Sequence, residues 1–318
     1  MAEKMTQGKL IAVVGATGGQ GGGLARAILA DRSTGFRVRA LTRDPNNAKA
    51  RALAALGAEV VAMDIDDPAS VTKGFTGANA AFCVTFFWEH FSPEKENTHA
   101  RSMAAAARAA GLEHVIWSTL EDSRTFIPLT DDRMPTLMGH YKVPHFDAKG
   151  ESDRYFEGLP VTYLLTSFYW DNLIHFGMAP KLGPDGRYGF VLPMGDRKLP
   201  GIAVDDIGKC ALGVFKRRAE FVGKRVGIAG EHLSGAEMAA TMAKTLGKDI
   251  HHVAVTPAAY RGFGFPGAED LGNMFQFNHD FADEFCRVRD LAVSRSLHPG
   301  LLTFAQWLER HQAQIPLG

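Results

Sequence analysis

A short apolar run that ends abruptly in glycines constrains this chain more than any other feature. The stretch LIAVVGATGGQGG covers residues 10–22, and its apolar part is rich in β-branched side chains. Such a run is typical of a strand buried on both faces of a parallel sheet, and a helix is expected to follow at residues 24–30. A strand, a glycine turn and a helix in this order present backbone N–H groups and a helix N-terminus to an anion.

The anion expected at this turn is the pyrophosphate of a dinucleotide. Its candidate contacts are Gly15, Thr17, Gly18, Gln20 and Gly21. The glycines permit a close approach of the backbone, and the two polar side chains either add contacts or face solvent. The glycine spacing departs from the GxGxxG fingerprint, so a purely structural turn is the alternative interpretation.

The chain downstream alternates between predicted strands and helices. We expect strands at residues 37–41, 59–63, 80–85, 114–118 and 161–165, separated by helical stretches. Asp67-Pro68 and Ser92-Pro93 are typical helix starts, with an N-cap followed by proline. The alternation predicts an α/β fold, a Rossmann-type doubly wound parallel sheet with right-handed crossovers.

The second half of the chain follows a looser pattern. Glycines and prolines between residues 166 and 199 indicate hairpins and loops, and helices are expected at 206–215, 257–260 and 304–311. Ser234 and Glu237 form a capping box for a helix that closes at Gly247. We therefore expect a Rossmann domain over residues 1–160, and a smaller mixed α/β C-terminal region over 161–318 that also completes the sheet.

Charge and cysteine content narrow the possible partners. Lys plus Arg equals Asp plus Glu at 35 each, so no net field attracts nucleic acid or an anionic membrane, although a local basic patch stays possible. The start, MAEKMTQGKL, lacks a signal-peptide pattern, and the apolar run 78–88 is too short to cross a bilayer. The three scattered cysteines suit a reducing compartment, and Cys83 is expected in the core. These features predict a cytoplasmic protein.

The end of the second predicted strand bears on cofactor choice. An acidic residue there often holds the ribose hydroxyls of NAD, but this chain has Thr42-Arg43. The planar guanidinium of Arg43 can pair with a 2′-phosphate, which predicts NADP(H). A solvated surface arginine beside Asp44 is the alternative. After the third strand, Asp64 and Ile65 are expected near the adenine ring.

Six segments together resemble one known family: GATGGQGG, LTRDP, VTFFWE, HFDAKGE, YWDNL and GFGFPGAEDLGNMFQF. They resemble the NmrA-like family, an atypical branch of the short-chain dehydrogenases, over nearly the whole chain. The chain is most similar to members described as NADPH sensors. The resemblance implies a Rossmann domain with a small C-terminal domain, NADP binding and regulation through protein partners.

The segment HFDAKGE raises the question of catalysis. Active short-chain dehydrogenases use Tyr-x-x-x-Lys on one helix face, with the tyrosine as proton donor. Here Lys149 matches the lysine, but His145 stands where the tyrosine belongs. Lys149 is expected either to position ribose and nicotinamide or to be a solvent-exposed helix lysine. His145 is either a proton donor or an ordinary structural histidine, and Ser118 or Thr119 fills the family's serine position.

The remaining candidate contacts lie after the fourth and sixth strands. Thr85, Tyr169 and Asn172 are expected near the cofactor. The aromatic residues of segment 167–173 either cover the nicotinamide or belong to the core. Relatives carry a proline-containing turn before this segment, whereas Thr166 and Ser167 stand here. This departure puts in doubt the transfer of nicotinamide contacts.

Two functions follow from this pattern. The first, which we favour at this stage, is an NADP(H)-binding sensor or regulator whose occupancy shifts residues 85–89 and the C-terminal region, changing self-association as a homodimer or the surface offered to a regulatory protein. The second is an NADPH-dependent reductase of a quinone, aldehyde or enone that uses Lys149. A nucleotide-sugar epimerase fits less well because it needs the absent tyrosine. No metal is expected, since His251 and His252 lack further ligands.

Overall fold

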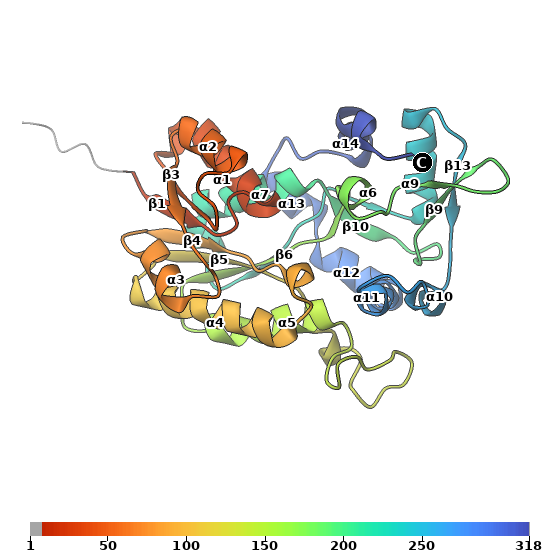
Figure 1. The fold of residues 1–318 in the computed structure, drawn as a ribbon, viewed down its shortest axis with the longest axis horizontal. Helices are drawn as coiled ribbons and strands as arrows, with labels where there is room; N and C mark the ends of the chain where they lie inside the picture. The colour runs from red at the N-terminus through yellow and green to blue at the C-terminus, as the bar shows by residue number, and fades with distance from the viewer. Residues whose placement is uncertain (1–7, 318) are drawn as a thin grey trace, which may run out of the picture.

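A seven-stranded parallel sheet lies between two layers of helices in the computed structural model, which describes residues 8–317 (Figure 1). The opening residues 1–7, which bear on the expectation of no signal peptide, lie outside the described residues. The strand order is β11-β6-β5-β4-β1-β2-β3, and every pair is parallel. The strands are β1 (Leu10–Val13), β2 (Arg37–Thr42), β3 (Glu59–Ala62), β4 (Ala80–Cys83), β5 (His114–Thr119), β6 (Val161–Leu165) and β11 (Arg225–Gly227).

The two helical layers cover opposite faces of this sheet. Successive residues of β1 alternate between them: Ile11 and Val13 enter one core and Ala12 the other. One layer contains α1 (Gly19–Ala30), α2 (Ala48–Ala55), α7 (Val204–Lys216) and α13 (Leu291–Leu297). The other contains α3 (Pro68–Phe75), α4 (Pro93–Ala109), α5 (Pro144–Ser152) and the 3₁₀ helix η4 (Asp153–Phe156). The doubly wound Rossmann-type fold expected from the sequence is confirmed.

The C-terminal part of the chain adds two small sheets and a further core. One sheet has the order β12-β10-β7 and the other β13-β9-β8. The strands of these two sheets are β7 (Phe168–Tyr169), β8 (Lys181–Leu182), β9 (Tyr188–Val191), β10 (Leu199–Ile202), β12 (Glu231–Leu233) and β13 (Ile250–Val253). Its helices are α6 (Asn172–His175), α8 (Arg218–Phe221), α9 (Gly235–Leu246), α10 (Pro257–Arg261), α11 (Ala268–Asp280), α12 (Ala282–Val288) and α14 (Phe304–His311).

Helix α7 of the C-terminal half packs closely against α1 of the Rossmann body at two glycines. A Cβ on Gly208 of α7 would lie 2.0 Å from the backbone nitrogen of Leu24, and one on Gly23 of α1 would lie 2.8 Å from the backbone oxygen of Asp205. The two helices therefore pack backbone against backbone. Strands β6 and β11 and helix α7 come from residues after 160, so this half completes the sheet as well as forming its own sheets.

The glycine segment differs from the sequence expectation. Helix α1 begins at Gly19 rather than at residue 24, so the later glycines are helical. A Cβ on Gly21 would lie 2.5 Å from the oxygen of Val14 and 2.6 Å from that of Gly15. The missing side chains allow the helix to start directly against the end of β1. Strand β11 was not predicted, and α7 begins two residues earlier than expected, at Val204.

The predicted helix caps and the burial of Cys83 are confirmed. Asp67 and Ser92 cap α3 and α4 with their side chains, and Ser234 with Glu237 forms a capping box on α9. Cys83 is completely buried, and burial raises the pKa of its thiol. Within residues 8–317, no helix has the length and apolar character needed to cross a membrane. The same residues contain no group of three or more His, Cys, Asp or Glu side chains arranged for a metal ion.

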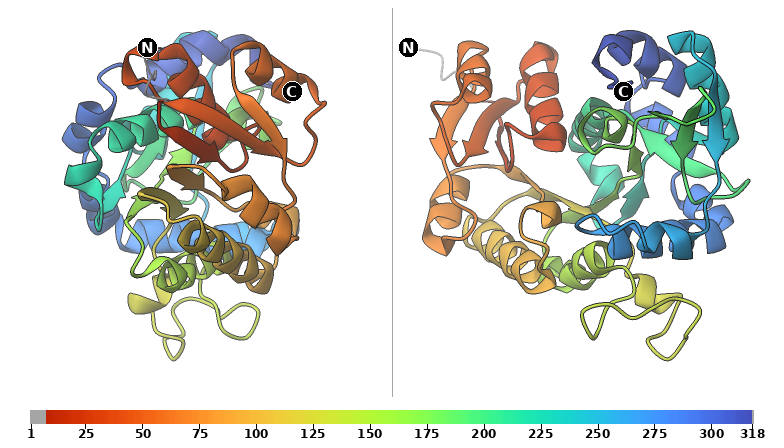
Figure 2. Two further views of the ribbon diagram at one scale, coloured as in Figure 1. Left: turned by 90° about the vertical axis from the view of Figure 1, so that its left-hand side faces the viewer. Right: turned by 45° about the vertical axis from the view of Figure 1, so that its right-hand side comes forward.

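The connection from β5 to α5 leaves the body of the fold. It contains the short helix η3 (Ser123–Thr125) and then a loop that projects outward, coloured yellow-green in Figures 1 and 2. Three other 3₁₀ helices are η1 (Arg32–Thr34), η2 (Phe87–Glu89) and η5 (Gln312–Gln314). Of these, η2 directly follows β4 and takes part in the candidate site.

Candidate functional site

The glycine turn after β1 forms a cradle for an anion. The sheet reverses its order between β1 and β4, and ligands of doubly wound sheets bind outside the strand ends at such a point. Gly15 has a φ of 63°, which favours glycine, and Gly18 caps α1 without any side-chain hydrogen bond. The first turn of α1 carries no acidic residue. Its N–H groups and positive dipole end are therefore available, and they fit a dinucleotide pyrophosphate.

Gln20 connects the cradle to the C-terminal half. Its amide nitrogen donates to the hydroxyl of Tyr169 at 2.6 Å, and its amide oxygen accepts from the hydroxyl of Ser118 at 2.8 Å. The Tyr169 hydroxyl also lies 3.3 Å from Oγ1 of Thr166, and burial raises the pKa of Tyr169. Gln20, Ser118 and Tyr169 are thus brought together across the crevice, although Gln20 and Tyr169 are far apart in sequence.

The other residues of segment 167–173 separate into different surroundings. Trp170 is buried against Phe304 and Trp307, so it belongs to the core of the C-terminal half. Phe168 is partly buried and packs near Phe275. Asn172 begins α6 and is half-buried. Tyr169 is therefore the aromatic residue of this segment that contacts the glycine-turn side of the crevice.

Residues that follow β2 and β3 line the other end of the cradle. Oγ1 of Thr17 lies 3.3 Å from Oγ1 of Thr42 at the end of β2. The next residue, Arg43, has a side chain that is 70% exposed and forms an ion pair with Glu89 of η2. After β3, Asp64 lies in an exposed turn and Ile65 packs against the core. Arg43, Asp64 and Ile65 therefore lie at neighbouring strand ends, as expected.

Lys149 is buried on α5 and holds a carboxylate. Its ammonium donates to the hydroxyl of Thr85 at 2.5 Å and lies 2.7 Å from Oε1 of Glu96 on α4. The Lys149 side chain is 12% exposed, so the interpretation as a solvent-exposed lysine is wrong. Glu96 is fully buried. Although burial raises its pKa, the charge of Lys149, the nearby ring of His90 and a hydrogen bond from Thr85 lower the pKa of Glu96 to about 2.

His145 is also held by a buried carboxylate. Its Nδ1 lies 2.6 Å from Oδ1 of Asp270 on α11, and its backbone N–H donates to the other oxygen of that carboxylate. Its ring packs on Trp88, with the ring centroids 4.7 Å apart, and on Phe87. His145 and Lys149 lie on the same face of α5 because they are four residues apart. Each has its own carboxylate partner.

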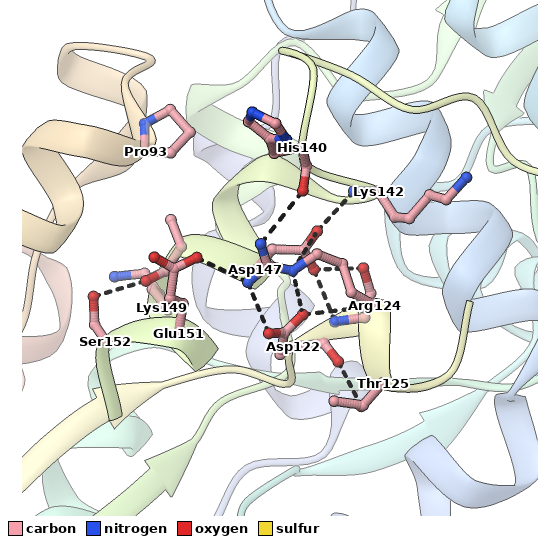
Figure 3. A network of polar contacts seen from close by, with 12 residues as sticks. Pro93, Asp122, Arg124, Thr125, His140, Lys142, Asp147, Lys149, Glu151 and Ser152 are labelled. Carbon is pink, nitrogen blue, oxygen red and sulfur yellow. Dashed lines mark hydrogen bonds and ion pairs between the residues drawn. The ribbon is translucent and has the colours of Figure 1, made fainter. Parts of the chain in front are cut away.

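A polar network fixes the start of α5 (Figure 3). Asp147 is buried and accepts hydrogen bonds from the backbone N–H groups of Ser123, Lys142 and Val143. Burial raises the pKa of Asp147 to about 6. Arg124 binds Asp122 and Glu151 around it. This network ties the projecting connection to the helix that carries Lys149 and His145.

Three functional candidates escaped the sequence analysis. Glu89, Glu96 and Asp270 are the carboxylate partners of Arg43, Lys149 and His145. Glu96 lies in the first turn of α4. Nothing in the neighbouring sequence indicated that the side chain of Glu96 points inward. The family-like run GAEDLGNMF contains Asp270, but nothing in that run indicated its partner.

Comparisons with known proteins find relatives that align with most of this chain. FrzB, an NmrA-like family domain-containing oxidoreductase from a Cladobotryum species, is 29% identical over 289 residues, covering 84% of this chain and 83% of its own. The similarly described ptmS of Penicillium ochrochloron is 28% identical and covers 96% of this chain and 98% of its own.

Solved structures give the same picture at the level of fold. NmrA, described as a negative transcriptional regulator and solved with NADP, has a TM-score of 0.76, with 24% identity over 95% of each chain. The Citrobacter sp. triphenylmethane reductase complexed with NADP(H) has a TM-score of 0.70, with 18% identity over 97% of this chain and 100% of that one. The model of the NmrA-like family matches residues 7–308. Because this match spans nearly the whole sequence, the chain belongs to the NmrA-like family.

Proposed function

We propose that this protein is an NADP(H)-dependent reductase of a quinone, aldehyde or enone. The observation that carries the proposal is the pair of proton-bearing side chains on one face of α5. His145 is buried and Lys149 is largely buried, and each is oriented by a buried carboxylate, Glu96 or Asp270. Such constrained donors beside a dinucleotide crevice suit a reaction that needs a proton at a fixed place. The oxidoreductase names of the relatives point the same way.

The residues that would hold the cofactor follow from the geometry. The amides around Gly18 would bind the pyrophosphate and Arg43 the 2′-phosphate, with Asp64 and Ile65 beside the adenine. Lys149 would hold the nicotinamide ribose, near Thr85. When bound, NADPH supplies a hydride. The protein's own part is to orient the acceptor and to supply the matching proton.

The missing tyrosine makes the proton source the central chemical question. Hydride addition to a carbonyl or enone carbon leaves negative charge on oxygen, which must be protonated or stabilised. The Lys149 ammonium, which lies 2.7 Å from the Glu96 carboxylate, provides that positive charge and a proton. His145 is a second donor, with Nδ1 held by Asp270 and no hydrogen bond to Nε2 among the described residues. Lys149 is therefore assigned the principal role and His145 the accessory one.

Steady-state kinetics test this assignment directly. Purified protein with NADPH is offered a panel of quinones, aldehydes and enones, and the loss of nicotinamide absorbance is followed. Lys149→Ala is expected to abolish turnover, and His145→Gln to reduce it. Lys95→Ala is the matched control, because Lys95 is an exposed lysine on the neighbouring helix α4. Tight NADPH binding with no turnover on any acceptor, or turnover that survives Lys149→Ala, would contradict the reductase assignment.

A specific contact favours a second function, that of an NADP(H) sensor or regulator. Residues 86–91 touch Arg43 through Glu89 and reach the start of α11, where a Cβ on Gly267 would lie 2.8 Å from Trp88 and 3.3 Å from Phe91. Cofactor binding at Arg43 would thereby alter the surface offered to a regulatory protein or to a second copy in a homodimer. Small-angle scattering and hydrogen exchange of the free and NADPH-bound protein test this function. Coincident results for the two forms would rule it out.

A further inference from the structure

The ion pair between Arg43 and Glu89 spans the crevice that the cofactor is expected to occupy. Arg43 follows β2 and Glu89 lies in η2 after β4, whereas β1, with its glycine turn, lies between these two strands in the sheet. The carboxylate therefore reaches over the cradle to the guanidinium. Arg43 is the positive side chain assigned to the 2′-phosphate, so Glu89 stands at the position of a ligand anion.

We infer that Glu89 is an internal competitor for the 2′-phosphate site and thereby limits the preference for NADP over NAD. This inference rests on the proposed role of Arg43. NADP carries a phosphate dianion that replaces the carboxylate on the guanidinium, through two parallel N–H···O bonds. NAD offers a neutral hydroxyl at the same place, which does not displace a carboxylate from an arginine. NAD therefore binds without displacing Glu89, and Glu89 weakens the binding of NADP alone.

The exposure of the pair makes the exchange feasible. The side chains of Arg43 and Glu89 are 70% and 47% exposed, so water and salt screen their attraction. A weak surface pair gives way to a stronger anion, whereas a buried pair such as that of Lys149 would not. The pair is therefore strong enough to weaken NADP binding and weak enough to be displaced.

Displacement has a structural consequence for the same segment. Residue Phe91 holds a φ of 52°, a left-handed conformation that is unfavourable for a bulky residue. Trp88, next to Glu89, packs on the ring of His145. Release of Glu89 removes one of the contacts that hold residues 86–91 in this conformation. The segment is therefore expected to exchange its amide hydrogens faster when a 2′-phosphate is bound.

Calorimetry with nucleotide fragments tests the inference without any turnover. The probes are 2′,5′-ADP, which carries the 2′-phosphate, and 5′-AMP, which lacks it. Glu89→Gln is expected to bind 2′,5′-ADP about twofold to fivefold more tightly than the parent, with binding of 5′-AMP unchanged. Glu94→Gln is the control, because Glu94 is an exposed carboxylate five residues away that binds Ser92 rather than Arg43.

Three outcomes separate this inference from the proposed role of Arg43. If Arg43→Ala leaves 2′,5′-ADP binding unchanged, the assignment of Arg43 to the 2′-phosphate is wrong. If Arg43→Ala weakens binding but Glu89→Gln has no effect, or the same effect as Glu94→Gln, only the competitor role is overturned. Hydrogen exchange of residues 86–91 is the second measurement. Equal exchange with 2′,5′-ADP and 5′-AMP would also overturn the displacement of Glu89.

Discussion

Replacement of Glu96 by glutamine tests how much the negative charge of this carboxylate stabilises the site around the Lys149 ammonium. Glu96 is fully buried and lies 2.7 Å from the Lys149 ammonium, whose side chain is only 12% exposed. Glutamine keeps the size of the side chain and one oxygen acceptor, but it removes the negative charge. The variant therefore leaves a buried ammonium without its counterion.

The size of the effect can be worked out in two ways. Interactions with Lys149 and its neighbours outweigh the burial of Glu96 and lower its pKa from 4.5 to about 2. Since one pKa unit corresponds to about 1.4 kcal/mol, the ionised carboxylate stabilises the folded state by roughly 3 kcal/mol. Removing one partner of a buried pair costs about 3–5 kcal/mol in other proteins. We expect Glu96→Gln to lose about 3 kcal/mol of unfolding free energy at pH 7.

The sign of the pH dependence follows from the lowered pKa. A carboxylate whose folded pKa is depressed contributes its full stability above its unfolded pKa, here 4.5. As the pH falls toward 2, the Glu96 carboxylate becomes protonated in the unfolded chain while it stays ionised in the folded chain. The stability difference between the parent and Glu96→Gln is therefore constant near pH 7 and shrinks below about pH 5.

Urea unfolding, followed by tryptophan fluorescence at a series of pH values from 7.5 to 4, measures this difference. Glu94→Gln is the matched control, because it removes an exposed carboxylate from the same first turn of α4 and is expected to change stability by less than about 0.5 kcal/mol. The double variant Glu96→Gln with Lys149→Met should lose less than the two single changes added together. A loss below about 1 kcal/mol, or a difference that stays constant down to pH 4, would refute the reasoning.

Three further substitutions test other parts of the structure. Gly208→Ala places a Cβ 2.0 Å from the backbone nitrogen of Leu24, so we expect a loss of about 3 kcal/mol or failure to fold; near-parental thermal stability would show that α1 and α7 can separate freely. Asp147→Ala leaves buried backbone N–H groups without an acceptor and should cost about 3 kcal/mol in urea unfolding, whereas an unchanged midpoint would contradict its role in fixing α5. Tyr169→Phe removes the acceptor for the Gln20 amide at 2.6 Å; we expect about 1 kcal/mol less stability and weaker NADPH binding by calorimetry, and parental values in both would argue against that contact.

The sequence predicted the features that depend on neighbouring residues. The cap of Asp67 reaches a backbone N–H two residues on, and the capping box of Ser234 and Glu237 spans three. Strand β6 and helix α14 have the predicted limits because apolar spacing and caps decide them locally. The start of α1 was misplaced because glycine is a poor helix former. Here the close approach to Val14 and Gly15 outweighs that propensity.

The partners of the candidate residues could not be predicted in the same way. Arg43 and Glu89 are 46 positions apart, and His145 and Asp270 are 125 apart. Gln20 and Tyr169 are separated by 149. These pairs exist because the fold brings together helices and strand ends that are distant in the sequence, and no periodicity in one segment predicts the other. The candidate residues themselves were therefore predictable, but the residues that pair with them were not.

The carboxylate partners of Lys149 and His145 also bear on whether these α5 residues serve function or only stability. A buried ion pair is seldom worth more than well-packed apolar residues of the same size, since each ion loses its hydration. Lys149 with Glu96 is such a costly arrangement, and one helical turn away His145 contacts the buried carboxylate of Asp270. Stability alone does not account for either pair. What both pairs provide is a fixed position for a proton-bearing group, and this is the property that a reducing site without the usual tyrosine requires.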